Sequence, residues 1–385
     1  MPEKAPVHWC FITPEYPPTV GGVADYTRLV ATHLVQAGQQ VTVLAPSRGE
    51  PPRDEGLAVE PVLGKFGPIG FWRGSQVLDS LPRTRRLFLQ WVPHGFGFKS
   101  INLLVVLWIW WRVVIRRDQL WIMVHEPFLR FENSLRQWIA ALIHRLMVWI
   151  LLRCAEKVFA GNKFWISLLT FWAPRKQVIQ WLPVPSNVCE NVSNEEESVI
   201  RAQLGNNKFL IGNFGTYGKN TTKLLESFFY KILIKDGKYG VVCIGKNSDV
   251  FVSSFIQLYP ALAKRIFSTG SLNGNDLSKH IKSCDLFVQL NQEGVSTRNG
   301  TLMAILSHGK TGVGNKGIVT CAELQEWNSW QCFWIVETDK VEEVVIKISD
   351  DQRLIRNFET RAKKVYNDQF SIESLVKKIL ELNNK

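Results

Sequence analysis

The stretch VHWCFITPEYPPTVGGVADYTRLVATHLVQAGQQVTVLA, residues 7–45, sets the fold class of this chain. Its first six residues, 7–12, form an apolar run typical of a buried strand. Apolar side chains then recur at spacings of three and four from Val23 to Gln36, which predicts a helix that ends before Gly38. Residues 40–45 return to a strand pattern. A strand, a helix and a strand in so short a span predict a parallel sheet with a right-handed crossover.

The alternation of strands and helices continues, pauses after residue 185 and then restarts. Leu182-Pro183-Val184-Pro185 leads into the polar, acidic stretch 186–198, which has the composition of an interdomain linker. Two successive α/β units predict two doubly wound domains, 1–185 and 186–365. The further elements predicted are strands at 87–92, 120–124, 157–160, 209–213, 241–245, 266–268 and 286–290, and helices at 101–116, 134–154, 221–235, 278–283, 300–307, 340–348 and 350–367.

Composition and charge limit the class of protein. The 385 residues are 46% apolar and 21% charged, which excludes disordered, collagen-like and coiled-coil classes. The formal net charge of +12 favours polyanions: nucleic acid, an anionic lipid surface or phosphorylated small molecules. Nucleic acid fits poorly, because the sequence contains no recognised nucleic-acid-binding module and no continuous basic stripe.

The cysteines and the apolar runs indicate the cellular compartment in which the protein is expected to work. Seven cysteines are scattered singly, without a CxxC pair, which favours a reducing compartment over a disulfide framework or a structural zinc site. The apolar run at 7–12 is too short for a secretory signal, and no run of about 20 residues is free of charge. We therefore expect a cytoplasmic protein without a spanning helix.

The residues from Tyr16 to Tyr26, YPPTVGGVADY, closely resemble the opening of the retaining family-4, or group 1, glycosyltransferases. Later landmarks occur in the order that the family shows: His125-Glu126-Pro127, Leu182–Pro185, a glycine loop ending in Lys219, Thr269–Leu272, Cys284–Val288, Glu293-Gly294-Val295 and Tyr366–Ser371. The resemblance implies the GT-B fold, in which two Rossmann-like domains face each other across a cleft. It further implies that residues 1–185 bind the acceptor, that 186–365 bind a nucleotide-sugar, and that a C-terminal helix over 366–385 packs back toward the first domain.

Several residues match donor-binding positions of the family. A nucleotide-sugar has a diphosphate whose charge grows as the glycosidic bond breaks, so its site needs backbone N–H groups, helix N-termini and cations. Gly21 and Gly22 allow close backbone approach, although the same pair also suits an ordinary tight turn. Lys219 would meet the donor phosphates, but a lysine after a glycine loop is equally well a solvated turn residue. The other positions that the resemblance assigns to the donor are Gly215, Leu272, Gly294, Val295 and Ser296.

The sequence departs from the family pattern at two places. Most members have an arginine in the glycine loop that here contains Asn213, Thr216 and Tyr217. The family also places a second glutamate eight residues after Glu293, to hold the ribose hydroxyls, whereas Thr301 stands there. Our hypothesis is that Arg298, just before a helix N-terminus, faces the diphosphate and replaces the missing arginine. The alternative is a turn arginine that faces solvent.

His125 and Glu293 are the candidate catalytic residues. His125 follows the strand 120–124 at its carboxyl end, where clefts of α/β domains form, although an isolated histidine often has a purely structural role. By resemblance Glu293 binds the donor sugar and stabilises developing oxocarbenium charge; a plainer role is to stabilise a helix dipole. The implied mechanism is retaining transfer, without a dedicated nucleophile. The sequence contains no cluster of Asp and His residues that would hold a metal ion, so we expect neither a metal nor a cofactor.

The acceptor cannot be read from the sequence. Tyr16, His94 and Glu126 are the candidate acceptor-binding residues, and the segment 90–97 lines the acceptor pocket or is a bland turn. A lipid-linked saccharide, a polysaccharide and a small molecule all remain open. The donor base and the donor sugar are equally undetermined.

Two predicted helices, 101–116 and 134–154, combine tryptophan with arginine. That mixture suits a helix lying on an anionic bilayer surface. Helices that are apolar nearly all round are more often buried in a domain core. We expect most of their surface to be buried and one face to reach a membrane, so the protein would be peripheral on the inner face of the membrane.

Three functions compete on this evidence. The first is a hexosyltransferase-like enzyme that moves a sugar from a nucleotide-sugar to a hydroxyl acceptor. The second is a catalytically silent GT-B protein that acts as a binding partner, which the missing glutamate and arginine favour. The third is a nucleotide-sugar epimerase, which would turn over the donor without an acceptor. The first is favoured because Gly21-Gly22, His125, Lys219 and Glu293 are retained together.

Overall fold

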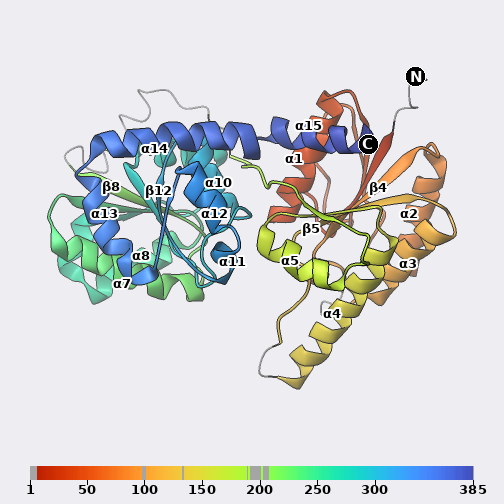
Figure 1. Ribbon diagram of the computed structural model, residues 1–385, viewed down its shortest axis with the longest axis horizontal. Helices are drawn as coiled ribbons and strands as arrows, with labels where there is room; N and C mark the ends of the chain where they lie inside the picture. The colour runs from red at the N-terminus through yellow and green to blue at the C-terminus, as the bar shows by residue number, and fades with distance from the viewer. Residues whose placement is uncertain are drawn as a thin grey trace. The chain divides into compact units, whose positions relative to one another are not determined.

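The chain forms two compact units, each built on a parallel sheet (Figure 1). The computed structural model describes residues 7–97, 101–131, 134–188, 190, 201–202 and 208–384, with only the backbone of Lys219 and Asn220, so most of the expected linker 186–198 lies outside the described residues. One unit comprises Met1–Pro183 with Leu375–Lys385 and the other Val184–Ser374, where the sequence predicted divisions after residues 185 and 365. The prediction of two Rossmann-like α/β domains is confirmed.

The first unit contains a seven-stranded sheet in the order β3-β2-β1-β4-β5-β6-β7. Because the strand order reverses between β1 and β4, this unit has the switch point at which α/β domains bind ligands. The strands are β1 (His8–Ile12), β2 (Gln40–Leu44), β3 (Leu57–Glu60), β4 (Arg85–Trp91), β5 (Gln119–Val124), β6 (Lys157–Ala160) and β7 (Ile179–Trp181). The helices are α1 (Gly22–Gln36), α2 (Pro68–Ser80), η1 (Pro93–Gly95), α3 (Leu103–Val114), α4 (Leu135–Cys154) and α5 (Lys163–Trp172).

The second unit contains a six-stranded sheet in the order β10-β9-β8-β11-β12-β13, with its switch point between β8 and β11. The strands are β8 (Phe209–Phe214), β9 (Tyr239–Ile244), β10 (Ile266–Ser268), β11 (Leu286–Gln289), β12 (Gly312–Asn315) and β13 (Trp334–Val336). The helices are α7 (Lys219–Lys235), α8 (Ser248–Leu258), η3 (Pro260–Arg265), α9 (Gly274–Ser283), α10 (Gly300–Ser307), α11 (Ile318–Cys321), α12 (Leu324–Trp330), η4 (Thr338–Lys340), α13 (Val341–Ser349) and α14 (Gln352–Val365).

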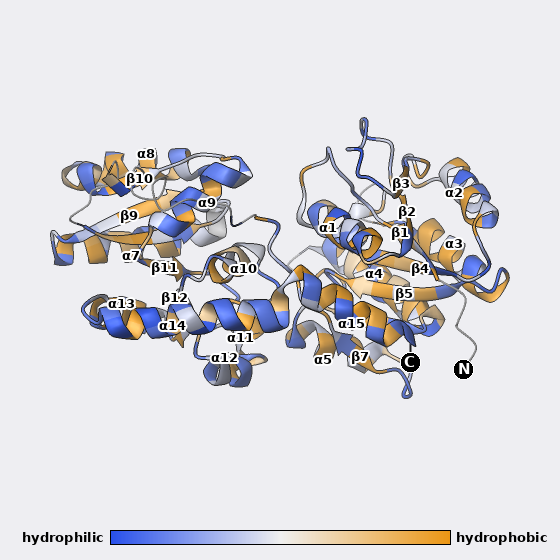
Figure 2. Ribbon diagram, turned by 90° about the horizontal axis from the view of Figure 1, so that it is seen from above, coloured by the Kyte–Doolittle hydropathy of each residue, from blue (hydrophilic) through white to orange (hydrophobic). Residues whose placement is uncertain are grey.

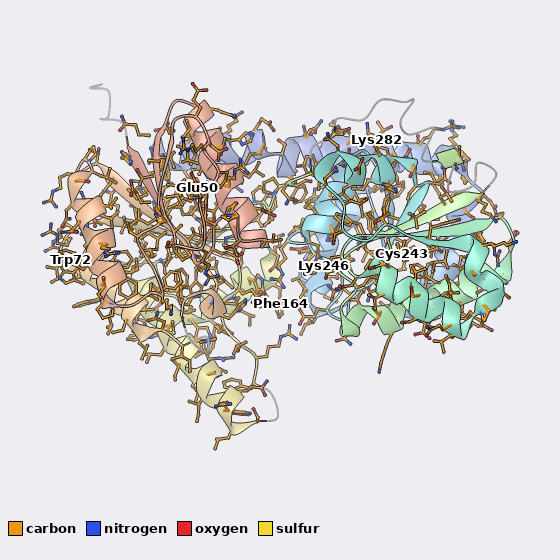
Figure 3. The ribbon with its side chains drawn as sticks, turned by 180° about the vertical axis from the view of Figure 1, so that it is seen from behind. Glu50, Trp72, Phe164, Cys243, Lys246 and Lys282 are labelled. Carbon is orange, nitrogen blue, oxygen red and sulfur yellow. The ribbon has the colours of Figure 1, made fainter. Side chains whose placement is uncertain are left out.

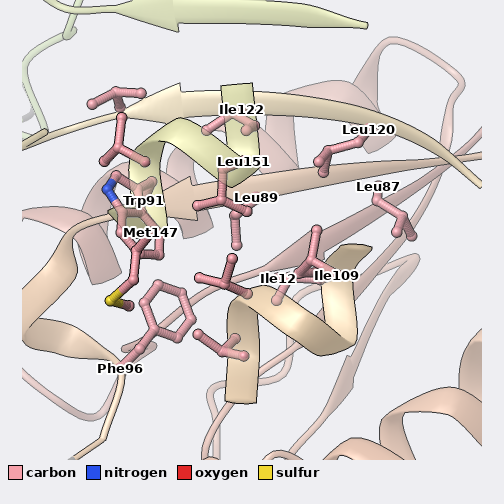
Figure 4. Packing of buried hydrophobic residues seen from close by; sticks show 14 of the residues in the cluster. Ile12, Leu87, Leu89, Trp91, Phe96, Ile109, Leu120, Ile122, Met147 and Leu151 are labelled. Atoms are coloured by element: carbon pink, nitrogen blue, oxygen red, sulfur yellow. The ribbon is translucent and has the colours of Figure 1, made fainter. Parts of the chain in front are cut away.

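The central strands of the first unit are buried on both faces. All seven residues of β4 are buried, as expected for a strand in the middle of a parallel sheet with helices on both faces. On one face, leucine and isoleucine side chains of the strands pack against Ile109 of α3 and against Met147 and Leu151 of α4 (Figure 4). The inner faces of α3 and α4 therefore belong to the core.

The end of the chain packs on the first unit, which confirms the predicted return of the C-terminal helix. α14 continues through a π-helical turn, Tyr366–Phe370, into α15 (Ile372–Asn384). Lys378 of α15 donates to the backbone oxygen of Trp181 at 2.6 Å, and Arg86 donates to the side-chain oxygen of Asn383. Residues from 375 onward are thus fastened to strands of the first sheet.

A buried histidine gives the second unit a pH-dependent stability. His308 is 5% exposed, Nε2 lies 2.6 Å from the Ser278 hydroxyl, and burial lowers the pKa of the imidazole. In the pH range between this lowered pKa and the ordinary value near 6.5, only the unfolded chain binds the proton, so stability falls as the pH drops. We expect the free energy of unfolding to fall below pH 6.5 by up to about 1.4 kcal/mol per pH unit from this group.

Urea unfolding between pH 7.5 and 5 measures this dependence. The variant His308→Gln is expected to flatten it, because glutamine binds no proton in either state. A slope that survived the substitution unchanged would assign the dependence to other groups, among them His8, whose pKa burial also lowers.

Candidate functional site

A pocket of about 200 Å³ lies at the carboxyl ends of β8 and β11, at the switch point of the second sheet. It includes two of the predicted donor-binding residues, Gly215 and Val295, together with Thr301. Its lining carries no formal charge. The lining residues are Asn213, Phe214, Gly215, Thr216, Tyr217, Thr221, Leu225, Gln289, Leu290, Asn291, Val295, Asn299, Thr301 and Leu302. A ligand in this pocket would meet amides, hydroxyls, backbone groups and the first turn of α7.

The glycine loop beside the pocket is held in one conformation. The Asn213 side chain donates to the backbone oxygen of Val288 at 2.7 Å, and the Tyr217 hydroxyl donates to the backbone oxygen of Asn213 at 2.8 Å. Gly245 lies so close that a Cβ there would meet the Gly215 oxygen at 2.3 Å. α7 begins directly after the loop, and Thr221 of its first turn lines the pocket. The N-terminus of this 17-residue helix favours an anionic ligand there. The side chain of Lys219 lies outside the described residues.

The turn that follows Glu293 is held by a buried carboxylate that the sequence analysis missed. Glu323 is 2% exposed, and its carboxylate accepts from the Thr297 N–H at 2.8 Å and from the Thr297 hydroxyl at 2.5 Å. Gly294 has φ +82°, and a Cβ there would meet the Thr320 hydroxyl at 2.1 Å, so only glycine fits. These contacts fix the backbone of residues 293–297 next to the pocket.

The structure separates the predicted donor residues into two groups. Gly215 and Val295 line the pocket, and Gly294 and Ser296 belong to the buried turn around Val295. Gly294 and Ser296 are not themselves in the lining, and neither are Leu272 in the loop before α9 or Glu293 and Arg298, which lie half-buried on either side of the turn.

In the first unit, His125 stands at the carboxyl end of β5 with its ring fixed from two sides. Its backbone N–H donates to the Trp91 oxygen at 2.9 Å, and the buried Tyr26 of α1 meets the ring edge-on at 4.9 Å between centroids. His125 Nε2 lies 3.0 Å from Gln90 Oε1, while Gln90 Nε2 donates to the Phe88 oxygen at 3.4 Å. With the amide oriented in this way, Gln90 Oε1 is the acceptor, and the Nε2–H tautomer of the ring donates to it.

Gln90 is the second residue that sequence reasoning missed. Residues 90 and 91 were predicted both as the end of the strand 87–92 and as the start of the segment 90–97 that lines the acceptor pocket or is a turn; both belong to β4, as the strand prediction had it, and Gln90 is fully buried. The segment that leaves the strand begins at Val92 and forms η1. Gln90 is therefore a positioning residue for His125.

At the start of α1 the first N–H groups are bonded to a side chain of the chain itself. Glu15 Oε1 accepts from the Val23 N–H at 3.1 Å and from the Ala24 N–H at 3.2 Å. A Cβ on Gly21 would lie 2.2 Å from this same oxygen, whereas the space next to Gly22 is open. The glycine pair thus admits a carboxylate at the helix N-terminus, and a phosphate bound there has to displace Glu15.

The three acceptor candidates have different surroundings. His94 Nδ1 and Glu126 Oε2 are 3.5 Å apart at the carboxyl end of the sheet, and both side chains are about half exposed. Tyr16 is only 3% exposed, and its hydroxyl has no hydrogen-bond partner among the described residues. Burial raises the pKa of Tyr16. His94 and Glu126 are accessible to a ligand, whereas Tyr16 is packed.

Metal ligands do not cluster in the part of the chain that the structure describes, where no three His, Cys, Asp or Glu side chains lie close enough to hold an ion. The expectation of metal-independent chemistry stays a prediction.

Comparisons with known proteins agree with this fold. Residues 20–171 match the model of the family described as Glycosyltransferase Family 4. No curated protein matches the sequence. HepE of Anabaena, solved in complex with UDP and glucose, superposes with a TM-score of 0.69 at 14% identity, over 98% of this chain and 99% of that one. Sucrose-phosphate synthase of Thermosynechococcus elongatus gives 0.73 at 12% identity, over 98% of each chain. A glycosyltransferase of Rickettsia africae gives 0.70 at 14%, over 97% of each.

The two parallel sheets, their switch points and these likenesses give the chain the GT-B fold. The family match covers residues 20–171, and over those residues it agrees with the resemblance to the family-4 glycosyltransferases that the sequence shows.

Proposed function

We propose that the protein transfers a hexose from a UDP-sugar to a hydroxyl acceptor with retention of the anomeric configuration. The observation that carries the proposal is the neutral pocket of about 200 Å³ at the switch point of the second sheet, with the N-terminus of α7 beside it. A nucleoside fits a pocket lined by amides and hydroxyls, and its diphosphate fits the helix end. UDP is the base to test first because HepE was solved with UDP.

The proposal assigns roles to residues near the pocket. Gly215, Val295 and Thr301 contact the nucleoside, and the backbone of residues 294–296 borders the phosphate or the sugar, with Leu272 at the same ligand. Lys219 and Arg298 supply the cations that a pocket without formal charge otherwise lacks. Gly21 and Gly22 admit the donor at the N-terminus of α1 once Glu15 moves away.

In the proposed reaction the bond between the anomeric carbon and the phosphate oxygen breaks while the acceptor oxygen attacks the same face. The acceptor proton passes to the departing phosphate oxygen, so no enzyme nucleophile is needed. Glu293 binds the sugar hydroxyls and stabilises the oxocarbenium charge, and His125 contacts the donor with its ring held by Gln90. His94 and Glu126 contact the acceptor, and the packed Tyr16 belongs to the same acceptor site. The transfer proceeds without a metal or another cofactor in a cytoplasmic protein.

Thermal unfolding of the purified protein with UDP, GDP, ADP and their sugar conjugates tests the donor. A ligand at about 100 times its dissociation constant stabilises the native state by about 2.7 kcal/mol, so we expect the UDP series alone to raise the midpoint. Arg298→Ala should shrink that shift, and the matched control Arg356→Ala, an exposed arginine of α14, should not.

The same experiment separates the competing functions. If none of the nucleotides shifted the midpoint, the catalytically silent binding partner would replace the enzyme. Conversion of the UDP-sugar to its epimer without an acceptor would identify an epimerase. For a transferase, proton NMR of the sugar that is first released by slow donor hydrolysis gives the anomeric outcome, and turnover in excess chelator is expected to be unchanged.

A further inference from the structure

Helix α3 of the first unit turns an apolar face to solvent. Its inner side chains, among them Val105, Val106 and Ile109, belong to the core. The outer positions of a surface helix are normally polar. Here they are apolar and between 37% and 57% exposed: Leu103, Leu104, Leu107, Trp110, Trp111, Val114 and Ile115. A stripe of seven exposed apolar side chains at helical spacing is not a chance scatter of single residues.

Helix α4, which packs beside α3, shows the same pattern. Met147, Leu151 and Leu152 face the core, while the outer stripe is 41% to 79% exposed: Leu135, Trp138, Ile139, Leu142, Leu146 and Trp149. The first half of α4 extends beyond the rest of its unit (Figure 1), and α3 is largely in the hydrophobic colour in Figure 2. A further tryptophan, Trp72 of α2, is 61% exposed on this unit (Figure 3). We call the two outer stripes of α3 and α4 the apolar face.

Among the described residues α4 is the one helix long and apolar enough to cross a membrane, by length and composition, and a third of its apolar window is buried inside the unit. Its packing opposes a transmembrane position. Arg145 donates to the backbone oxygens of Leu129 and Ala141, and its guanidinium stacks on Phe131 at 3.9 Å. Crossing a bilayer would remove Met147 and Leu151 of α4 from the core of the unit. Lying on the surface of a membrane would leave both residues in the core, because only the outer stripe of the helix would contact lipid.

The exposed charges on the two helices are positive. Residues 101–117 and 134–155 contain six arginines and no aspartate or glutamate; of these, Arg112 is buried in an ion pair with Asp118, and Arg116 pairs with Asp79. Arg136 and Arg117 are exposed near the ends of the stripes, and the exposed Arg153 lies 3.8 Å over the Trp149 ring. Tryptophan and arginine around a leucine-rich stripe match the interface of an anionic bilayer, where each aromatic ring sits at the headgroups and each cation meets a lipid phosphate.

We infer that the apolar face of α3 and α4 binds peripherally to the surface of an anionic lipid bilayer. A second copy of the chain is the poorer occupant, because it would bring arginine against arginine. The inference stands apart from the proposed function, and only its corollary rests on that function: an enzyme held in this way would act on a lipid-linked acceptor.

Flotation of the full-length protein with vesicles tests the inference. We expect binding to phosphatidylcholine vesicles that contain 30% phosphatidylglycerol and at least tenfold weaker binding to phosphatidylcholine alone. The double variant Trp138→Ser with Leu142→Ser should lower the partition coefficient by about tenfold or more, because both side chains leave water on binding. Arg136→Gln and Arg153→Gln should each lower it by about fivefold.

The matched control is Ile234→Ser with Leu258→Ser, two exposed apolar residues of the second unit, 57% and 61% exposed, which should bind as the parent does. Unchanged midpoints of thermal unfolding show that the variants fold. Absence of binding to both vesicles, or equal binding of the Trp138 variant and the control, would overturn the inference. The inference would also be overturned if sedimentation showed a dimer that the double variant Trp138→Ser with Leu142→Ser dissociates. Vesicle binding requires no turnover, so it fails or succeeds independently of the transferase.

Discussion

Replacement of His125 by alanine is expected to lower kcat for sugar transfer by about a hundredfold to a thousandfold, with a smaller change in KM. The ring stands at the carboxyl end of β5, and it is oriented by Gln90 at 3.0 Å and by Tyr26 edge-on at 4.9 Å. A polar group held in advance in this way binds the transition state without reorganising, and removal of one such preorganised group costs about 10² to 10³ in rate. Steady-state kinetics with the donor identified by thermal unfolding measures the effect.

Two further variants make this result specific. Gln90→Leu leaves the imidazole present but removes its partner, so kcat should fall less than in His125→Ala. His280→Ala, a substitution on α9 in the second unit, should leave kcat unchanged. If His125→Ala retained the parent kcat, His125 would have a structural role, and Gln90 would only complete its hydrogen bonding.

The sheet architecture could be predicted because a buried parallel strand appears in the sequence as a short, continuous run of apolar residues. β5 is apolar from Leu120 to Val124, and β5 and β6 begin and end within one residue of the predicted bounds. β12, GVGN, has one large apolar residue, so no local pattern distinguishes it from a loop. It is a strand because β11 and β13 pair with it on both sides.

The positioning residues of the site could not be predicted for the same reason. Glu15, Gln90 and Glu323 act on partners 8, 35 and 26 residues away in the sequence. No spacing rule connects such pairs, because the fold alone brings them together. The glycines were easier to recognise, since the close approach that excludes a Cβ at Gly21 and Gly294 restricts the residue type itself. Sequence therefore located the loops of the site and missed the side chains that hold them.

The helix arrangement under the apolar face depends on a buried ion network. Asp118 forms an ion pair with Arg85, whose Nε lies 2.7 Å from Oδ1, and accepts a hydrogen bond from Arg112 Nε at 2.6 Å; all three side chains are at most 3% exposed. At the edge of the network, hydrogen bonds from Arg116 and Arg112 outweigh burial and hold the pKa of Asp79 below its usual value. The network thereby joins α3 to α2 and to strands β4 and β5.

Asp118→Asn is expected to lower the free energy of unfolding of the first unit by about 3 to 5 kcal/mol, because it leaves Arg85 and Arg112 buried without their shared anion. Urea unfolding followed by tryptophan fluorescence measures the loss. Asp79→Asn is the matched control: Asp79 is 35% exposed, so water screens the vacated charges and the loss should stay near 1 kcal/mol. Equal losses in the two variants would mean that Asp79 neutralises the buried arginines as much as Asp118 does. A loss below 1 kcal/mol for Asp118→Asn would show that the buried network contributes little to holding α3 on the sheet.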